Sequence, residues 1–320
     1  MFLSGKIAGD FRKKHILSIS QFDQASIAKL FKKTDWILSR VKRKKDLNIL
    51  KRSVATLLFF EPSTRTFVSF SSAMKKMGGT TIDLLKPNET TSFFKGESLA
   101  DAVKVFGTYT DLIIIRHPEK GYVQKVAEAS PVPVISGGDG AGEHPTQALY
   151  DTYTIYQRFR KLSGLKGLIL GDALYSRSIH SLLKALALYD ANTIFLLSPK
   201  GLELSKELES ELKHSLKIVK IQQESEIPND CNFWYTNRIQ KERFKSSSLY
   251  KKAVSDFPVI TPSLLKKKGN KKMIILDPLP RVGNTDMRVD DDPRALYLSK
   301  QLENGLYVRM ALVGLVLGKL

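Results

Sequence analysis

Cysteine, acidic residues and long apolar runs are all scarce in this sequence. Its 320 residues include a single cysteine, Cys231, so no disulfide can form within the chain, which fits a reducing compartment. The longest apolar run, 310–318, has about half of the ~18 residues that a membrane span needs, and residues 1–14 lack the apolar core of a signal peptide. We therefore expect a soluble, cytoplasmic protein without a membrane partner.

Acidic residues are too few to balance the basic ones. The 51 Lys and Arg residues against 32 Asp and Glu residues give a formal net charge of +19, with dense basic runs at 40–52 and 266–272. Neither run contains aromatic residues, and the chain has no zinc-finger spacing or RNP-like motif, so we expect no nucleic-acid partner. We interpret the runs as solvated surface, although a positive cleft would also concentrate an anionic small molecule.

The order of apolar segments predicts an α/β fold. A length of 320 residues suggests two domains, and no internal repeat is present. Helical periods at 67–77, from Pro145 onward and at 179–186 alternate with short apolar runs typical of strands. The strand, helix and strand over 168–197 are typical of a parallel sheet. The predicted strands are 54–60, 112–115, 132–135, 168–170, 193–197, 233–235 and 273–276.

Parallel sheets bind ligands beyond the carboxyl ends of their strands, so polar residues that follow the predicted strands are candidate site residues. The strand 54–60 leads into the hydroxyls of Ser63, Thr64 and Thr66 and the guanidinium of Arg65, immediately before a helix. Hydroxyls, a guanidinium and the free N–H groups of a helix N-terminus form an anion site. The alternative is an ordinary Ser/Thr helix cap beside a surface arginine.

Two further segments place an arginine and a histidine in similar positions. Arg116 directly follows the predicted strand 112–115, where it could bind a ligand or a structural carboxylate. His144 precedes Pro145, which is favoured at the first position of a helix. The positive helix end favours a neutral imidazole that can still donate one hydrogen bond, although His144 could also be only a cap. The nearby glycines do not have GxGxxG spacing, so a nicotinamide site is not favoured.

The second half of the sequence adds cations suited to carboxylates. Arg177 and Arg238 each follow a predicted strand and could bind a carboxylate through two hydrogen bonds. The segment 277–281 contains two prolines, which predict an irregular turn in which one X-Pro bond could be cis. The set as a whole suggests a multiply anionic substrate. Because the sequence shows no metal-ligand cluster, Ser-His-Asp set or paired carboxylates, we expect electrostatic catalysis without a metal or cofactor.

These motifs together resemble the carbamoyltransferase family. The segments 63–66 (STRT), 116–118 (RHP), 144–147 (HPTQ) and 278–281 (PLPR) match its order and spacing along nearly the whole chain. Residues 238–243 (RIQKER) and 303–307 (ENGLY) match the aspartate branch. The ornithine branch typically has a cysteine in the proline loop and an Ser-Met-Gly element, and this sequence has neither.

The resemblance implies two α/β domains, each with a parallel-rich sheet flanked by helices, joined by interdomain helices. Residues 1–148 with 299–320 would bind carbamoyl phosphate, and residues 149–298 would bind aspartate. The expected reaction transfers the carbamoyl group to the amine of L-aspartate, an early step of de novo pyrimidine biosynthesis. The resemblance also implies a homotrimer with shared active sites, while a regulatory chain or a dihydroorotase partner stays open.

Roles carry over by the same resemblance to residues that match the family motifs. The phosphate would be held by Ser63, Thr64, Arg65, Thr66 and Arg116. His144 and Arg116 would act on the carbonyl oxygen, and the carbamoyl amide would be oriented by Gln147 and the backbone of Leu279 and Pro280. The aspartate carboxylates would be bound by Arg177, Arg238 and Gln240. From the neighbouring subunit would come Thr91, Ser92 and Lys95, with Lys95 meeting the phosphate and assisting at the aspartate site. The residues implied in catalysis are His144, Arg65, Thr66, Arg116 and Lys95.

Three residues depart from the family pattern: Phe67 replaces a usual second arginine, Leu174 a common lysine, and Asp277 a usual histidine. Phe67 removes a cation that could steady the phosphate loop. Asp277 adds negative charge near an anion site, which should weaken binding unless Arg281 or another cation neutralises it. These departures leave open a binding module that keeps the fold without turnover.

Overall fold

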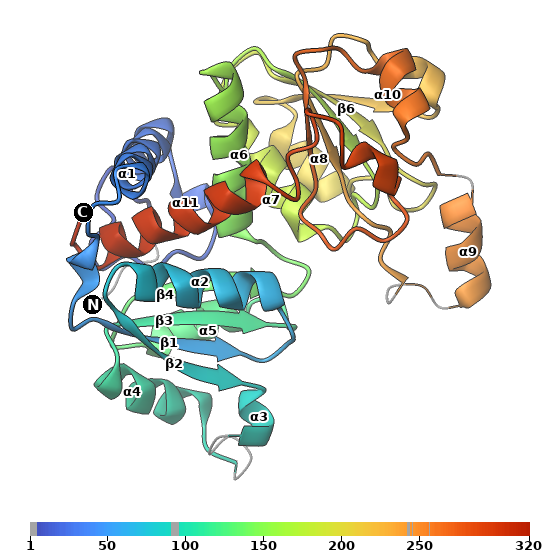
Figure 1. Ribbon diagram of the computed structural model, residues 1–320. Coiled ribbons are helices and arrows are strands. Elements are labelled where there is room, and N and C mark those ends of the chain that lie inside the picture. The colour runs from blue at the N-terminus through green and yellow to red at the C-terminus, as the bar shows by residue number, and fades with distance from the viewer. Residues whose placement is uncertain (1–4, 91–95, 242–243, 245, 256) are drawn as a thin grey trace. The chain divides into compact units, whose positions relative to one another are not determined.

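The computed structural model describes residues 5–90, 96–241, 244, 246–255 and 257–320 (Figure 1). The chain folds into two compact units: unit 1 is Met1–Tyr150 with Glu303–Leu320, and unit 2 is Asp151–Leu302. The two boundaries fall inside helix α6 (Pro145–Phe159) and helix α11 (Lys300–Val316). Within the described ranges, none of the helices has both the length and the apolar character that crossing a bilayer requires.

Unit 1 is built on a four-stranded parallel sheet in the order β2-β1-β3-β4. Its strands are β1 (Val54–Phe59), β2 (Thr80–Leu85), β3 (Leu112–His117) and β4 (Val134–Asp139). Helices α2 (Thr64–Lys76) and α4 (Leu99–Tyr109) lie on opposite faces of this sheet (Figure 1). The other α-helices that lie wholly in unit 1 are α1 (Gln24–Lys42), α3 (Pro87–Thr90) and α5 (Tyr122–Ala129), and short 3₁₀ turns span Ile19–Gln21 and Asn48–Leu50.

Apolar packing on both faces explains why the central strands of unit 1 have nearly continuous apolar sequences. Leu58, Ile113 and Ile115 of the sheet are buried in one cluster with Val103 of α4 and Val126 of α5. Helix α2 begins at Thr64, three residues before the predicted start at Phe67, and its chain turns away at Gly78 with φ +81°. Arg65 and Thr66 therefore lie in the first turn of α2 rather than in the loop before it.

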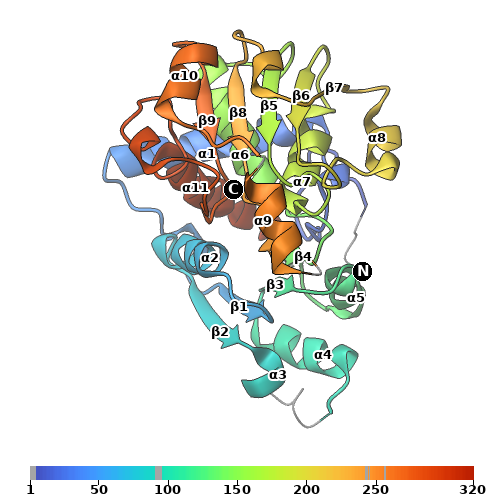
Figure 2. The same ribbon diagram turned by 90° about the vertical axis from the view of Figure 1, so that its right-hand side faces the viewer.

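Unit 2 has a five-stranded parallel sheet in the order β7-β6-β5-β8-β9, and Figure 2 shows these strands side by side. The strands are β5 (Lys166–Leu170), β6 (Thr193–Leu197), β7 (Lys217–Ile221), β8 (Phe233–Thr236) and β9 (Ile274–Leu276). The helices are α7 (Arg177–Leu186), α8 (Lys206–Leu212), α9 (Ser247–Ser255) and α10 (Pro262–Lys268), with 3₁₀ turns at Glu224–Glu226 and Met287–Val289. The core on one side of the sheet joins Leu168 and Trp234 to Leu264, Ile275 and Tyr297.

The strand order of each sheet creates one point where successive connections leave in opposite directions. In unit 1 this point lies between β1 and β3, and in unit 2 it lies between β5 and β8. Ligands of open parallel sheets bind outside the carboxyl ends of the strands at such a point. The predicted α/β class with parallel sheets is confirmed. The topology indicates that the loops after β1, β3, β5 and β8 are the candidate ligand-binding loops.

Candidate functional site

The loop after β1 presents the first turn of α2 at the switch point of unit 1. Ser63 is the N-cap residue, and within the described part of the chain its side chain makes no capping hydrogen bond. Thr64 and Arg65 are exposed, while Thr66 is buried. Because the first N–H groups of any helix have no acceptor inside it, this turn offers donors to an anion. The geometry favours the anion site over the simple cap.

Arg116, near the end of β3, is held from two sides. Its Nη2 atom lies 2.6 Å from Oε1 of Glu61, and its Nη1 atom donates to the carbonyl of Gly137 on β4 at 3.2 Å. The structure thus shows the ion pair that was one of the two alternatives for Arg116. Since Glu61 follows β1, the pair also fixes the guanidinium at the switch point, where it can serve the other role as well.

His144 and Thr66 lie together under the first turn of α2. Both are buried, and the Nε2 atom of His144 lies 3.5 Å from Oγ1 of Thr66. Helix α6 begins at Pro145, as predicted, and the carbonyl of His144 accepts the N–H of Gln147 at 3.0 Å. A Cβ atom on Gly137 would lie 3.4 Å from Cγ2 of Thr66, so β4 approaches α2 closely here. The ends of β1, β3 and β4 therefore gather Arg116, Thr66 and His144.

Gln147 is also buried beside His144 on the first turn of α6. Its Oε1 atom accepts a hydrogen bond from the hydroxyl of Tyr150, one turn further along the helix. This contact fixes the orientation of the amide that the family resemblance assigns to the carbamoyl group.

The residue that follows Arg116 is part of a small aromatic cluster. The His117 ring stacks on the Tyr122 ring with centroids 3.5 Å apart and an interplanar angle of 6°, and Phe60 meets it edge-on. The Nδ1 atom of His117 accepts the N–H of Glu119 at 3.0 Å. Burial lowers the pKa of His117 and raises the pKa of Tyr122, so both rings favour their neutral forms. This packing steadies the end of β3 next to Arg116.

Arg309 on α11 is a part of this site to which the sequence pattern assigns no role. Its guanidinium, in a side chain only 4% exposed, donates to Oγ of Ser69 at 2.6 Å and to Oγ1 of Thr146 at 3.4 Å. It also lies 5.0 Å from the ring centroid of Phe70 and 5.1 Å from that of Tyr150. Arg309 therefore connects α11 to α2, which carries Thr66, and to α6, which begins directly after His144.

Phe67, the first departure from the family pattern, packs against the ring of Phe59. Its ring meets that of Phe59 edge-on, with centroids 5.4 Å apart and an interplanar angle of 87°. Leu174, the second departure, is half-buried and its backbone N–H donates to the carbonyl of Leu202; nothing in the structure explains this substitution.

In unit 2, Asp172 joins the two loops at the switch point. It follows β5 and is fully buried; its Oδ1 atom accepts the N–H of Tyr175 at 2.9 Å, and its Oδ2 atom accepts Nε2 of Gln240 at 3.4 Å. Its carbonyl accepts Nδ2 of Asn237, which follows β8. The loop before Arg177 and the loop that carries Gln240 are therefore bonded to each other.

A close backbone approach supports the same junction. Gly171 has φ +130°, and a Cβ atom there would collide with the side chain and the carbonyl oxygen of Asn237. Only glycine fits such a position without a shift of the neighbouring chain. Arg177 begins α7 and Arg238 follows Asn237, and both are half-buried. The geometry thus brings the segments of the three predicted carboxylate-binding residues, Arg177, Arg238 and Gln240, to one end of the sheet.

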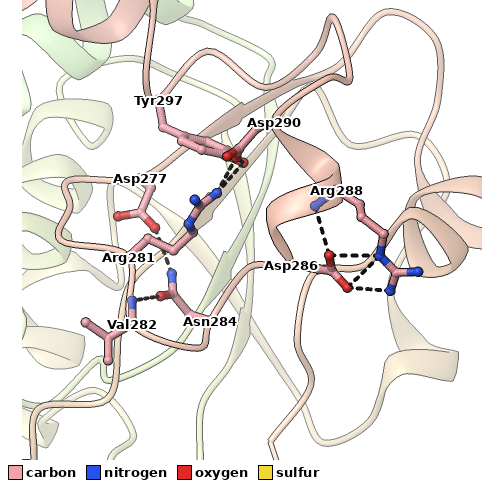
Figure 3. A network of polar contacts seen from close by, with 8 residues as sticks. All are labelled: Asp277, Arg281, Val282, Asn284, Asp286, Arg288, Asp290 and Tyr297. Carbon is pink, nitrogen blue, oxygen red and sulfur yellow. Dashed lines mark hydrogen bonds and ion pairs between the residues drawn. The ribbon is translucent and has the colours of Figure 1, made fainter.

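The proline turn follows β9 at the same end of the sheet. The Leu279–Pro280 peptide is cis, as the two prolines suggested for one bond, and Leu279 has φ +59°. Arg281 is bonded to Asp290 and lies 3.4 Å from the hydroxyl of Tyr297 (Figure 3). The hydrogen bond from Arg281 lowers the pKa of Asp290. The pKa of Tyr297 is raised mainly by burial and, to a smaller extent, by its hydrogen bond to Asp290. The contacts of Arg281 are thus with Asp290 and Tyr297, not with Asp277 as the sequence allowed.

Thr91, Ser92 and Lys95, which the resemblance assigns to a neighbouring subunit's site, lie outside the described residues. Among the residues that are described, no group of three or more His, Cys, Asp or Glu side chains is arranged to hold a metal ion. The side chains gathered after β1, β3, β5 and β8 are mainly hydrogen-bond donors and cations, which suit anions and a developing negative charge.

Comparisons with known proteins cover nearly the whole chain. Residues 14–157 match the family model for the carbamoyl-P binding domain of aspartate/ornithine carbamoyltransferase, and residues 163–316 match its Asp/Orn binding domain. The chain is 39% identical over 304 residues to the aspartate carbamoyltransferase catalytic subunit of Archaeoglobus fulgidus, covering 95% of this chain and 99% of that one. It is 40% identical over 310 residues to the multifunctional protein CAD of Squalus acanthias.

The match to CAD covers 97% of this chain but only 14% of the length of that relative. A solved structure of aspartate transcarbamoylase from Trypanosoma cruzi, in complex with carbamoyl aspartate and phosphate, superposes with a TM-score of 0.89 at 33% identity. That superposition covers 96% of this chain and 97% of the other. The chain belongs to the aspartate/ornithine carbamoyltransferase family.

Proposed function

We propose that this chain is an aspartate carbamoyltransferase. It transfers the carbamoyl group of carbamoyl phosphate to the amine of L-aspartate, giving N-carbamoyl-L-aspartate and phosphate, within pyrimidine biosynthesis. The observation that carries the proposal is the gathering of Arg116, Thr66 and His144 at the switch point of unit 1, beside the open first turn of α2. Relatives of matching length that carry this enzyme's name support it.

In this proposal each substrate is bound mainly by one unit, and Leu279 and Pro280 of unit 2 add to the binding of the carbamoyl group. Unit 1 binds carbamoyl phosphate: Ser63, Thr64, Arg65 and Thr66 hold the phosphate with helix N–H groups, and Arg116 holds phosphate and carbonyl oxygens. Gln147 and the backbone of Leu279 and Pro280 orient the carbamoyl amide. Unit 2 binds aspartate through Arg177, Arg238 and Gln240, since a guanidinium can hold a carboxylate by two parallel hydrogen bonds.

The reaction needs no covalent link to the protein. The aspartate amine attacks the carbonyl carbon and forms the new C–N bond, and the carbonyl electron pair moves onto oxygen. When the tetrahedral intermediate collapses, the carbonyl double bond re-forms and the C–O bond to phosphate breaks with its electron pair. The proton lost by the amine passes to the departing phosphate. His144 and Arg116 donate to the developing oxyanion, and each such donor is worth about 3 kcal/mol of barrier in comparable sites. Alignment of the two substrates supplies several kcal/mol more.

An assay of the purified chain tests this function. With millimolar carbamoyl phosphate and L-aspartate, we expect colorimetrically detectable carbamoyl aspartate and a stoichiometric release of phosphate. L-Ornithine in place of aspartate should give no product. Binding of both substrates without product would instead favour a fold that is kept without turnover.

The oligomeric state is a further part of the proposal: a homotrimer whose sites share Lys95, Thr91 and Ser92 of the neighbouring subunit. We expect inactive Lys95→Ala chains mixed with inactive His144→Ala chains to recover part of the activity, because some sites then contain both native residues. Sedimentation of the chain alone checks that mixed trimers form. Zero recovery in verified mixed trimers would argue against shared sites.

A further inference from the structure

The backbone of the proline turn is held in a conformation that its sequence does not favour. Leu279 has φ +59°, in the left-handed region. For a residue with a Cβ atom this region is unfavourable, and the residue stays there only when its surroundings fix it. Leu279 is also the residue whose backbone the proposed function assigns to the carbamoyl amide. The contacts that fix it therefore bear on substrate binding.

Asp277 supplies those contacts from inside the turn. Its side chain is 2% exposed; the Oδ1 atom accepts the N–H of Leu279 at 2.5 Å, and the Oδ2 atom accepts Nδ2 of Asn284 at 2.7 Å. Its own N–H donates to Oε1 of Gln301 at 3.0 Å, and Gln301 is anchored in turn on Asp151 at 2.6 Å. The carboxylate of Asp277 thus fixes the N–H of Leu279, the residue with the strained φ. The backbone of Asp277 is in turn fixed by Gln301.

Asn284 closes the same turn from its other side. Its Oδ1 atom accepts the N–H of Val282 at 2.9 Å, and its Nδ2 atom donates to Oδ2 of Asp277 (Figure 3). The same Nδ2 atom also donates to Oγ1 of Thr236 at 3.2 Å. Thr236 is the last residue of β8, two residues before Arg238. The pair Asp277 and Asn284 therefore joins the proline turn to the start of the loop that carries the proposed aspartate ligands.

The orientation of each group matters here. Asn284 must present its oxygen to Val282 and its nitrogen to Asp277, and Asp277 must present acceptors on both sides. Each partner thus has an assigned donor or acceptor role, and a change of either one alone leaves two like groups facing each other. Arg281, the nearest cation in the sequence, is engaged by Asp290.

We propose that Asp277 is a positioning residue, paired with Asn284, that sets the backbone of Leu279 and Pro280 for the carbamoyl group. This inference rests on the proposed function and names a part of the same site. Asp277 takes the place of the histidine usual in the family, so this chain builds the turn with a carboxylate and an amide. The carboxylate stabilises the turn through its two acceptor oxygens rather than acting as a repulsive charge toward the substrate.

The test exchanges the two side chains. Asp277→Asn keeps the size of the side chain but places an NH₂ group against the NH₂ group of Asn284. Because a buried hydrogen bond to a charged group is lost, we expect kcat/KM for carbamoyl phosphate to fall roughly ten-fold or more. The double variant Asp277→Asn with Asn284→Asp restores a donor opposite an acceptor, and kcat/KM should return to within about three-fold of the native value.

Asp286→Asn is the matched control. Asp286 lies in the same segment, but its carboxylate is bonded to the exposed Arg288 and not to the proline turn. Its kinetics should equal those of the native chain. Amide hydrogen exchange adds a readout that does not depend on activity: the Leu279 and Val282 amides should exchange faster in Asp277→Asn and be protected again in the double variant.

The outcomes separate the two proposals. If the native chain makes no carbamoyl aspartate, the proposed function fails, while amide exchange still tests the turn. If the native chain is active and Asp277→Asn keeps both its kinetics and its protected Leu279 amide, the positioning role is wrong. If Asp277→Asn does not fold, a folded and active double variant supports the pair, and a double variant that also does not fold refutes it.

Discussion

Replacing Arg309 with methionine tests how the helices around the candidate carbamoyl phosphate site are held together. The native guanidinium donates to Ser69 on α2 and Thr146 on α6 and lies against the rings of Phe70 and Tyr150. Methionine can fill much of the same volume, so the change removes the charge and the donors more than the packing.

The size of the effect follows from these contacts. The hydrogen bond of 2.6 Å to Ser69 is charge-assisted and worth about 1.5–3 kcal/mol, and the ring contacts add about 1 kcal/mol. The hydrogen bond of 3.4 Å to Thr146 adds little. Removing a buried cation also removes its desolvation cost, which offsets part of the loss. We expect a net loss of about 2 kcal/mol, or roughly 4–8 °C in the melting midpoint of unit 1.

Arg40→Met provides the matched control. Arg40 also lies over an aromatic ring, 5.1 Å from the centroid of Trp36, and donates to the carbonyl of Asp46 at 2.8 Å. These contacts face solvent, so their loss should change the midpoint by no more than about 1–2 °C. Far-UV circular dichroism melts of the native chain and both variants make the comparison. Equal midpoints for Arg309→Met and Arg40→Met would refute the idea that the buried guanidinium holds α2, α6 and α11 together.

Two further predictions concern pH and the roles of site residues. Burial lowers the pKa of His15 from 6.5 to about 4, so the unfolded chain binds more protons between these values and stability falls by about 3 kcal/mol as the pH drops from 6.5 to 4. His15→Asn keeps an acceptor for the N–H of Val134, now 3.0 Å from Nδ1 of His15, and should flatten this dependence in urea melts; an unchanged slope would contradict it. Arg65→Ala should mainly raise KM for carbamoyl phosphate, whereas His144→Ala should mainly lower kcat; native steady-state kinetics in both would show that the site is assigned wrongly.

The sequence predicted the central elements because their signals are local. Strands β1, β3, β5, β6, β8 and β9 have apolar runs that follow from burial on both faces. Strands β2 and β7 were missed because they carry exposed polar residues that interrupt the apolar pattern, as the exposed Thr80 and Lys217 show. The prediction 132–135 for β4 stopped too early, because the strand continues through Gly137 and Gly138, which have low strand propensity.

The parts of the site that the sequence did not indicate depend on contacts between distant segments. Glu61 and Arg116 are 55 positions apart, and Arg309 meets Ser69 across 240 positions. The one signal for Arg309 was a cation next to the apolar run 310–318, where an exposed charge is not expected. Motif spacing predicted which residues bind the substrates, while the residues that hold those predicted side chains in place were found only in the fold.

For the departures from the family pattern, the fold adds hydrogen bonds that charge alone does not indicate. The sequence treated Asp277 as a negative charge added beside an anion site, which implies weaker binding. The fold shows that both of its oxygens accept hydrogen bonds, from the N–H of Leu279 and the amide of Asn284. The N–H groups that donate to a carboxylate point the positive ends of their dipoles toward it, and these dipoles partly offset its field at a neighbouring ligand. The same reasoning holds for Arg116, whose positive charge is balanced by Glu61 at 2.6 Å. The proposed anion binding at unit 1 would therefore draw, besides Arg116, on the exposed Arg65 and on the oriented N–H groups of α2, whose direction is fixed by the helix backbone.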